Sequence, residues 1–382
     1  MASKVLISAG EASGDLYASS LVEALRRHYP DLEFFGCAGP RMRKAGVRAI
    51  VDSASLAVVG LVEVITHIPR IRGEFHKLVE AAKRERPDVA ILTDSPDFHL
   101  RLAKQLKRLG VPVIYLVAPQ VWAWRKGRLP GMRRLINRLL CIFPFEQEFF
   151  DQHGIPATYI GHPLTRLVRP SATRIELRHR LGVSEDTRLI ALLPGSRKGE
   201  IARHLPYLIE ATKQIRAAFA GRGVECILAL PPGLNFTERF QFPSIQVKEG
   251  QTWDILACAD LALAASGTVT IEASLLQTPM ITFYRVNKLS WVMGKLLVRV
   301  PFYSMVNLVA GRKIVPELMQ NELTGSRLAA EAVRLLSDDN ATQDMRRELA
   351  LLAQKLSGPE DPMDVAASIV EQFLTKEMVH VS

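Results

Sequence analysis

The chain has 382 residues, of which 48% are hydrophobic and 23% are charged, so it can bury two sizeable cores and is not expected to be disordered. Its formal net charge of +10 favours an anionic partner, whether nucleic acid, an acidic membrane surface or a phosphorylated substrate. The four cysteines stand far apart without a C-x-x-C pair, which argues against a zinc site or a disulfide scaffold and fits a reducing cytoplasm.

Short apolar runs alternate with amphipathic helical stretches along the whole chain, which predicts parallel β-sheets connected by helices. We expect no signal peptide, because the N-terminus enters an apolar strand at once and has no long hydrophobic core followed by a small-residue cleavage site. We expect no membrane span, because no run approaches the roughly 20 apolar residues that cross a bilayer. In the first half, strands are expected at 4–9, 33–37, 89–93, 111–117, 138–143 and 158–160. Helices are expected between them at 16–28, 71–86, 99–109 and 146–153.

A basic, proline-containing stretch at 164–173 is interpreted as a linker, after which the alternation starts again. Strands are then expected at 189–193, 225–229, 245–248, 261–264 and 280–283, and helices at 326–337, 342–356 and 363–376. The predicted fold is α/β, with doubly wound domains at 1–165 and 174–357 and a C-terminal helix in 358–382 that packs back towards the first domain. Because ligands of such sheets bind beyond the carboxyl ends of the strands, the loops after the strands hold the candidate sites.

The loop after strand 189–193 has the residue types of a phosphate site. Gly195 permits close backbone approach, Ser196 offers a hydroxyl, and Arg197 offers several donors suited to phosphate oxygens. The alternative is a plain turn from strand to helix with a solvated arginine.

A second loop runs through Ser266, Gly267 and Thr268 into a predicted helix, whose first N–H groups are suited to bind a diphosphate. Glu272 lies four residues after Thr268 on the same helical face, where a carboxylate can accept hydrogen bonds from ribose hydroxyls. Alternatively, Ser266 or Thr268 is the helix N-cap and Glu272 is a favourable acid near the start of the helix. Together with the preceding loop, the pattern favours a site for a nucleotide-sugar donor.

The loop after the first strand contains Gly10, Glu11, Ser13 and Asp15. It lacks both the G-x-G-x-x-G spacing of a dinucleotide site and the Gly-Lys-Ser/Thr ending of a P-loop, and its two carboxylates would repel a pyrophosphate. A ligand rich in hydroxyl or amine groups suits this loop better. The alternative for Ser13 and Asp15 is a helix cap.

Asp94 directly follows strand 89–93 and is our first choice for a general base that takes a proton from an acceptor hydroxyl. Asp97 has an alternative structural role as the cap of a helix beginning at Phe98. His99 is a rival base, but it lies one step into the helix.

Trp122 and Trp124 follow the next expected strand. Three cations come directly after them: Arg125, Lys126 and Arg128. This group could line a cleft, stack on a sugar or contact an anionic lipid, and part of the aromatic content has packing as its alternative role. His162, at the end of the first domain, is a further candidate on the acceptor side.

Eight motifs carry a resemblance to one known family: 10–15, 94–98, 119–125, 143–146, 161–163, 193–197, 266–272 and 307–312. In this order they resemble the lipid-A-disaccharide synthases, bacterial glycosyltransferases of the GT-B fold, in which two Rossmann-like domains face each other across a cleft. The resemblance implies transfer of a 2,3-diacylglucosamine unit, with inversion, from its UDP derivative to 2,3-diacylglucosamine 1-phosphate (lipid X). The implied products are a β-1,6-linked disaccharide 1-phosphate and UDP, formed in the cytoplasm at the inner membrane face.

The resemblance also implies roles for single residues. Asp94 matches the proposed catalytic aspartate of the family, Arg197 and 266–272 match its UDP-binding elements, and Asn307 lies in a further motif near the donor. Neither a metal nor a cofactor is implied.

Residues 289–300 have the pattern of an interfacial helix, with an apolar face flanked by Lys288, Lys295 and Arg299. A core helix with a solvated basic side is the alternative. We therefore expect peripheral contact with an anionic membrane surface.

Rival functions remain at this level. Another UDP-sugar enzyme of the same fold, such as a lipid II-forming transferase or a UDP-N-acetylglucosamine 2-epimerase, is disfavoured by the loops with Glu11, Asp15, Trp122 and Trp124. A nucleic-acid-binding protein is disfavoured because the cations are dispersed and no recognition motif is present. A homodimer is one of the open oligomeric states.

Overall fold

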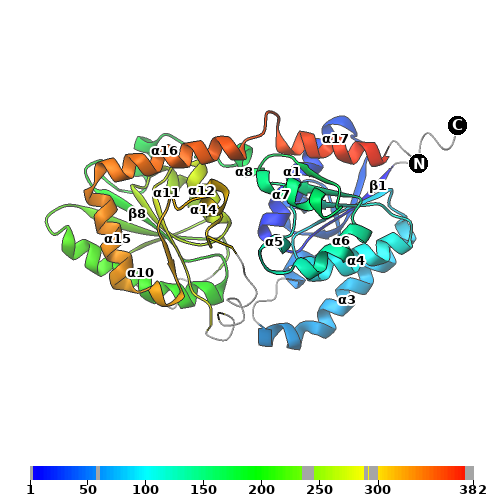
Figure 1. Cartoon of the computed structure of the whole chain (residues 1–382), viewed down its shortest axis with the longest axis horizontal. Helices are drawn as coiled ribbons and strands as arrows, with labels where there is room; N and C mark the ends of the chain where they lie inside the picture. The colour runs from blue at the N-terminus through cyan, green and yellow to red at the C-terminus, as the bar shows by residue number, and fades with distance from the viewer. Residues whose placement is uncertain (1–2, 57–60, 235–244, 288–290, 292–299, 375–382) are drawn as a thin grey trace. The chain divides into compact units, whose positions relative to one another are not determined.

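The structure is a computed structural model that describes residues 3–56, 61–234, 245–287, 291 and 300–374. The chain divides into two compact units (Figure 1). Unit 1 consists of Met1–Pro163 and Leu356–Ser382, and unit 2 consists of Leu164–Lys355. Each unit is built on one parallel sheet.

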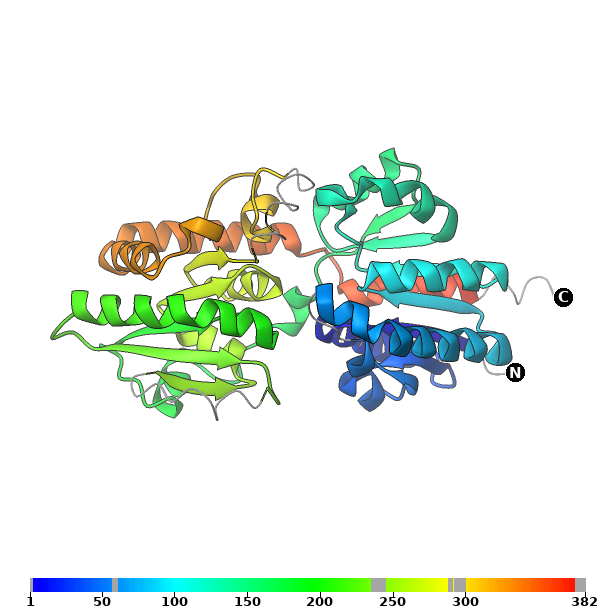
Figure 2. The same ribbon diagram turned by 90° about the horizontal axis from the view of Figure 1, so that it is seen from below.

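Unit 1 contains a seven-stranded sheet in the order β3-β2-β1-β4-β5-β6-β7. Its strands are β1 (Lys4–Ala9), β2 (Glu33–Ala38), β3 (Arg48–Asp52), β4 (Val89–Thr93), β5 (Val113–Leu116), β6 (Arg138–Cys141) and β7 (Ala157–Tyr159). Its helices are α1 (Ala12–His28), α2 (Pro40–Lys44), α3 (Leu61–Glu85), α4 (Pro96–Arg108), α5 (Val121–Trp124), α6 (Leu129–Leu135), α7 (Pro144–Gln152) and α17 (Pro362–Leu374). Helices α3 and α4 run side by side, and α17 packs against α1 (Figures 1 and 2).

Unit 2 contains a six-stranded sheet in the order β10-β9-β8-β11-β12-β13. Its strands are β8 (Arg188–Leu193), β9 (Val224–Leu230), β10 (Gln246–Glu249), β11 (Leu261–Ala265), β12 (Met280–Tyr284) and β13 (Glu317–Met319). Its helices are α8 (Leu164–Leu167), α9 (Arg174–Arg180), α10 (Lys198–Ala218), α11 (Thr252–Cys258), α12 (Thr268–Leu275), α14 (Met305–Ala310), α15 (Gly325–Ser337) and α16 (Asp339–Leu356), the last of which ends at the unit boundary.

The central strands are buried along their whole length, because helices cover both faces of each sheet. Every residue of β4 and of β11 is buried, which explains why these strands read as continuous apolar runs rather than as alternating ones. In unit 1 the same core includes Leu102 of α4 and Met132 of α6.

All of the expected strands are present, but β3 and β13 were not expected. Only Val51 of β3 is fully buried, and β13 has three residues, so neither forms an apolar run. The interpretation of 164–173 as a linker throughout was wrong at its start, because α8 occupies Leu164–Leu167 and Leu164 is buried.

In each sheet, the strand order reverses direction at one point. This point lies between β1 and β4 in unit 1 and between β8 and β11 in unit 2. Ligands of doubly wound sheets bind beyond the carboxyl ends of the strands at such points. The loops after these four strands are therefore the expected ligand-binding positions, and they contain most of the site residues predicted from the sequence.

Candidate active site

Asp94 follows β4, and its backbone makes the turn into α4. The φ angles of Asp94 and Ser95 are 55° and 37°, a left-handed conformation that residues other than glycine rarely adopt. The Asp94 carboxylate lies at the start of α1, where the N–H groups of Gly10 (2.9 Å) and Glu11 (3.0 Å) donate to it. Two loops that are far apart in the sequence thus form one site.

Two glycines make room for this carboxylate. A Cβ atom on Gly14 would lie 1.8 Å from Oδ2 of Asp94, and one on Gly10 would lie 2.5 Å from the Ser95 hydroxyl oxygen. Both distances are far below the roughly 3.5 Å of a favourable contact. Gly10 and Gly14 match no nucleotide fingerprint. Glycine is needed at both positions because the loop after β4 approaches the backbone too closely for a Cβ atom.

Three buried side chains support Asp94 from the interior. Nδ1 of His99 donates to the Asp94 carbonyl oxygen (3.0 Å), since that oxygen can only accept, and Nε2 then accepts from the Ser8 hydroxyl (2.8 Å). The Tyr115 hydroxyl donates to the same carbonyl oxygen. The sequence gives no direct signal for Ser8 or Tyr115, because both lie inside strands.

The pKa of Asp94 is raised to about 7. Burial is the largest cause, because it disfavours the charged form. The hydrogen bonds from Gly10, Ser95 and Glu11 lower the pKa, and the negative charge of Glu11 raises it. A carboxyl group that titrates near neutral pH is suited to accept a proton from a substrate and to release it afterwards.

The two alternatives to Asp94 have other partners. The alternative role of Asp97 as a helix cap was wrong, because α4 begins at Pro96 and its N-cap residue is Ser95. The Asp97 carboxylate instead binds Arg125 and Arg128. His99 is fully buried with both ring nitrogens engaged, and burial lowers its pKa to about 4.

The other candidates in the loop after β1 lie in different surroundings. Glu11 is exposed as the N-cap residue of α1, and Ser13 is half-buried in the first turn. Asp15 is buried, and its carboxylate accepts from the N–H groups of Arg41 (2.9 Å) and Met42 (3.1 Å). Asp15 therefore has the alternative role given by the sequence, a helix cap, and the helix that it caps is α2.

Trp124 and His162, both expected on the acceptor side, differ in exposure. Trp124 ends α5 and is 41% exposed, and the Arg125 guanidinium lies 4.1 Å from the centre of its ring. His162 is buried, with ring centres at 6.2 Å from Tyr17 and 5.4 Å from Phe143, and burial lowers its pKa to about 3. Trp124 is accessible to a ligand, whereas His162 packs inside unit 1.

Glu146 has a structural role that was not predicted from the sequence. Its buried carboxylate accepts from Nε1 of Trp122 (3.0 Å) and from the N–H group of Phe143 (3.2 Å), so it ties the loop after β5 to the start of α7. Burial raises its pKa to about 7. The available signal was an acid three residues after a helix N-cap position, as in a capping box.

In unit 2, Gly195, Ser196 and Arg197 form the loop between β8 and α10. Gly195 has a φ of 120°, a conformation that favours glycine. Glu200, in the first turn of α10, accepts from the Ser196 N–H group (3.3 Å) and the Tyr284 hydroxyl (2.8 Å) and lies 3.5 Å from Arg197 Nη1. Glu200, to which the sequence analysis assigned no role, therefore organises the loop.

The loop between β11 and α12 is adjacent, because β8 and β11 are paired. Gly267 is the N-cap residue of α12, so neither Ser266 nor Thr268 is the cap that the alternative proposed. The Ser266 hydroxyl donates to the Tyr303 carbonyl (3.2 Å), and no described residue accepts from the N–H group of Thr268. Glu272 is half-buried in the second turn.

Asn307 lies fully buried in α14. Its Nδ2 donates to the Val315 carbonyl (2.9 Å) and to Glu317 (2.8 Å), and its Oδ1 accepts from the N–H groups of Ile314 (2.7 Å) and Val315 (3.0 Å). The side chain thus holds the segment between α14 and β13 in place.

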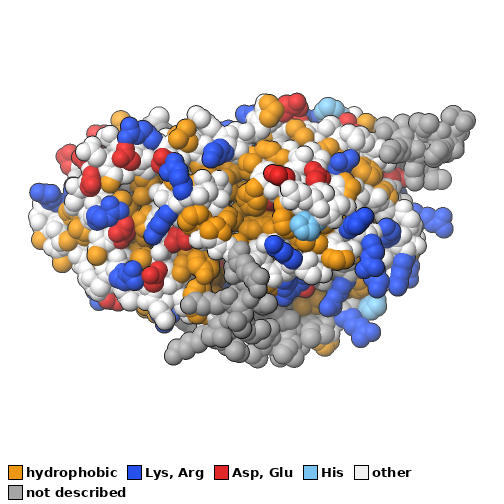
Figure 3. Space-filling view, viewed as in Figure 1, with side chains coloured by type: hydrophobic (Ala, Val, Ile, Leu, Met, Phe, Trp, Pro, Cys, Tyr) orange, Lys and Arg blue, Asp and Glu red, His pale blue; other side chains and the backbone are white. Residues whose placement is uncertain are grey.

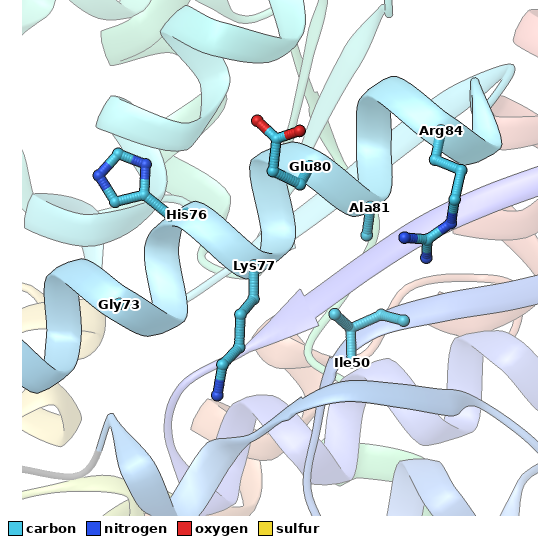
Figure 4. Close-up of a pocket in the computed structure, with 7 residues that line it drawn as sticks. All are labelled: Ile50, Gly73, His76, Lys77, Glu80, Ala81 and Arg84. Carbon is cyan, nitrogen blue, oxygen red and sulfur yellow. The ribbon is translucent and has the colours of Figure 1, made fainter.

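A surface pocket of about 420 Å³ lies elsewhere in unit 1 (Figure 4). Its lining residues are Ile50 of β3 and Gly73, His76, Lys77, Glu80, Ala81 and Arg84 of α3. None of these is a predicted site residue. Within the described part of the chain, no group of three or more potential metal-binding side chains is found.

Comparison with known proteins places these sites in a family. The family model described as "Lipid-A-disaccharide synthetase" matches residues 5–366. A lipid-A-disaccharide synthase of Solibacter usitatus is 58% identical over 381 residues, which is 99% of this chain and 100% of the relative. One of Myxococcus xanthus is 42% identical over 373 residues, covering 96% of this chain and 97% of the relative.

Solved structures show the same fold at low sequence identity. The UDP-GlcNAc 2-epimerase of Neisseria meningitidis bound to UDP-GlcNAc matches with a TM-score of 0.62 at 12% identity, covering 98% of this chain and 100% of the other. The calicheamicin glycosyltransferase CalG4 matches with a TM-score of 0.59 at 14% identity, covering 98% of each chain. The GT-B class expected from the sequence is confirmed.

Proposed function

Because the chain belongs to the lipid-A-disaccharide synthase family, we propose that it transfers 2,3-diacylglucosamine from its UDP derivative to lipid X, 2,3-diacylglucosamine 1-phosphate. Membership of the family makes the protein a glycosyltransferase of lipid A biosynthesis. The two substrates, the β-1,6 linkage and the inversion of the anomeric carbon are the specific content of the proposal.

The proposed mechanism rests on the pKa and the position of the Asp94 carboxylate. Its pKa of about 7 and its position beyond β4 suit a general base. The 6-hydroxyl of lipid X gives its proton to Asp94 while its oxygen forms a bond to the anomeric carbon. The bond from that carbon to the diphosphate breaks, and its electron pair leaves with UDP. Attack from the face opposite UDP inverts the configuration.

The donor is assigned to the loops of unit 2. Negative charge builds on the leaving diphosphate, and Arg197 together with the N–H groups at the start of α12 would stabilise it. Glu272, one turn further along that helix, suits the ribose hydroxyls. Asn307 acts on this site through the segment that it holds, because its amide group is engaged by Val315, Ile314 and Glu317.

Release of UDP from UDP-2,3-diacylglucosamine, measured with and without lipid X, tests the reaction. We expect release only when lipid X is present. In the Asp94→Asn variant, kcat should fall by about 10²- to 10⁴-fold, the usual contribution of a general base, while UDP binding measured by calorimetry stays unchanged. Turnover of UDP-N-acetylglucosamine in place of the acylated donor would favour a rival enzyme of the same fold, and an active Asp94→Asn variant would remove Asp94 from the base role.

Contact with an anionic membrane surface is a separate part of the proposal. No helix among the described residues combines the length and the apolar character needed to cross a bilayer. The interfacial helix predicted at 289–300 lies almost wholly outside the described residues, so it stays a prediction based on the sequence. Flotation with vesicles that contain an anionic lipid tests it: we expect binding at low salt, and its absence would contradict the proposal.

A further inference from the structure

A cluster of charged side chains lies beside the loop of Asp94. Asp97, in the first turn of α4, has a side chain that is 72% exposed. Nη1 of Arg125 donates to both of its carboxylate oxygens (3.0 and 2.9 Å), and Nη2 of Arg128 donates to one of them. Two guanidinium groups therefore converge on one exposed carboxylate. Among the described residues, the other guanidinium nitrogens of Arg125, Nε and Nη2, have no hydrogen-bond acceptor, while its backbone N–H group donates to Val121.

Tyr115 connects this cluster to the candidate base. Its buried hydroxyl donates to the carbonyl oxygen of Asp94. The pKa of Tyr115 is raised well above its usual value, first by burial and then by the charge of Asp94, while Arg128 lowers it and Asp97 raises it. The hydroxyl thus lies within electrostatic reach of Asp94 and of the cluster, which is expected because β4 and β5 are neighbours.

The cluster has a surplus of positive charge. Lys126, between the two arginines in the sequence, lies with its ammonium group 5.8 Å from the ring centre of Phe149. The segment from Arg125 to Arg128 therefore carries three cations, and two of them, Arg125 and Arg128, bind the single carboxylate of Asp97. Figure 3 shows further Lys and Arg side chains over α4 and α6 of unit 1. A phosphate monoester carries a charge of about −1.5 to −2 at pH 7, so it matches this surplus.

We propose that Arg125 and Arg128 bind the 1-phosphate group of the acceptor. The planar fork of a guanidinium group suits phosphate oxygens, and Asp97 holds both groups in position in the free protein. In a glucosamine ring, the phosphate-bearing C1 and C5 flank the ring oxygen, and C5 carries C6 with the reacting 6-hydroxyl group. The acceptor therefore needs a phosphate site close to the base, and the exposed ring of Trp124, under Arg125, adds a surface for the sugar.

This inference rests on the proposed function, since it takes lipid X as the acceptor. The test compares two acceptors, lipid X and 2,3-diacylglucosamine without the phosphate, at a fixed concentration of UDP-2,3-diacylglucosamine. Arg128→Gln and Arg125→Gln should each lower kcat/KM for lipid X by about 10- to 100-fold, mainly through KM, because a charge-assisted hydrogen bond is lost. For the acceptor without phosphate, kcat/KM should change by less than about twofold, as should the KM of the donor. Arg108→Gln, at the far end of α4, is the matched control and should behave like the wild type.

Each result has a distinct meaning. An equal loss with both acceptors, in both arginine variants, would overturn the phosphate site and leave the arginines with a structural role. A wild-type enzyme that prefers the acceptor without phosphate would overturn it as well. If the wild type releases no UDP with either acceptor, the proposed function itself fails. The more exposed Arg125 gives a second variant should Arg128→Gln fold poorly.

Discussion

The carboxylate of Asp94 lies against the N–H groups that begin α1, and burial at this position raises its pKa to about 7. A general base acts only in its deprotonated form, so the raised pKa moves the active range upward. We predict that kcat/KM for lipid X, measured by UDP release, rises about tenfold per pH unit below pH 7 and levels off above it. The measurement is a pH–rate profile between pH 5 and pH 9 with saturating donor.

The groups that face Asp94 should leave this profile undisturbed. His99 has a pKa lowered to about 4 by burial, and Tyr115 has a pKa raised well above its usual value, so neither titrates within the measured range. Burial and the charge of Asp94 hold the pKa of the Cys37 thiol far above this range, and the exposed Glu11 acts through its negative charge, which raises the pKa of Asp94. A flat profile from pH 5 to pH 9 would contradict the assignment of Asp94 as the base.

Gly14 tests the position of the same carboxylate. A Cβ atom there would lie 1.8 Å from Oδ2 of Asp94, so Gly14→Ala should displace the carboxylate and lower kcat by at least about tenfold. Gly73→Ala in α3 is the control, because an added Cβ meets nothing within 4 Å and alanine stabilises a helix interior by about 0.5–1 kcal/mol. Steady-state kinetics and thermal melting separate the two effects. Full activity of Gly14→Ala would show that the carboxylate tolerates displacement.

At the scale of elements, α10 sets the shape of the loop after β8 through Glu200. That carboxylate accepts from the Ser196 N–H group and the Tyr284 hydroxyl. Glu200→Ala removes both hydrogen bonds, so the KM for the UDP-sugar should rise about tenfold while the KM for lipid X stays constant. Lys213→Ala, on the exposed face of the same helix, should change neither constant. A change confined to the KM of lipid X would place the donor elsewhere.

The elements that the sequence predicts well are those whose burial is complete. Strands such as β4 and β11 are buried throughout and almost wholly apolar, because helices cover both of their faces. The edge strands β3 and β13 escape detection because neither forms an apolar run: only Val51 of β3 is fully buried, and β13 has three residues. Side chains divide in the same way into those that the sequence predicts and those that depend on the folded structure. Asp94 was found because it follows a buried strand, whereas the cap of α2 by Asp15 and the contact of Glu146 with Trp122 depend on folded loops.

At the scale of the whole molecule, the C-terminal residues Leu356–Ser382 belong to unit 1, although unit 2 precedes them in the chain. A substitution in α17 is therefore expected to destabilise unit 1 alone. Val370 of α17 is fully buried, whereas Ser368 on the same helix is exposed. Val370→Asp buries a charge without a designed partner and should destabilise unit 1 by several kcal/mol, while Ser368→Asp should be nearly neutral. Because Arg197 and α12 belong to unit 2, the Val370→Asp variant should lose transferase activity and yet keep UDP binding. Thermal melting with and without UDP, together with calorimetry, checks this, and loss of UDP binding alongside activity would mean that the two units do not fold independently.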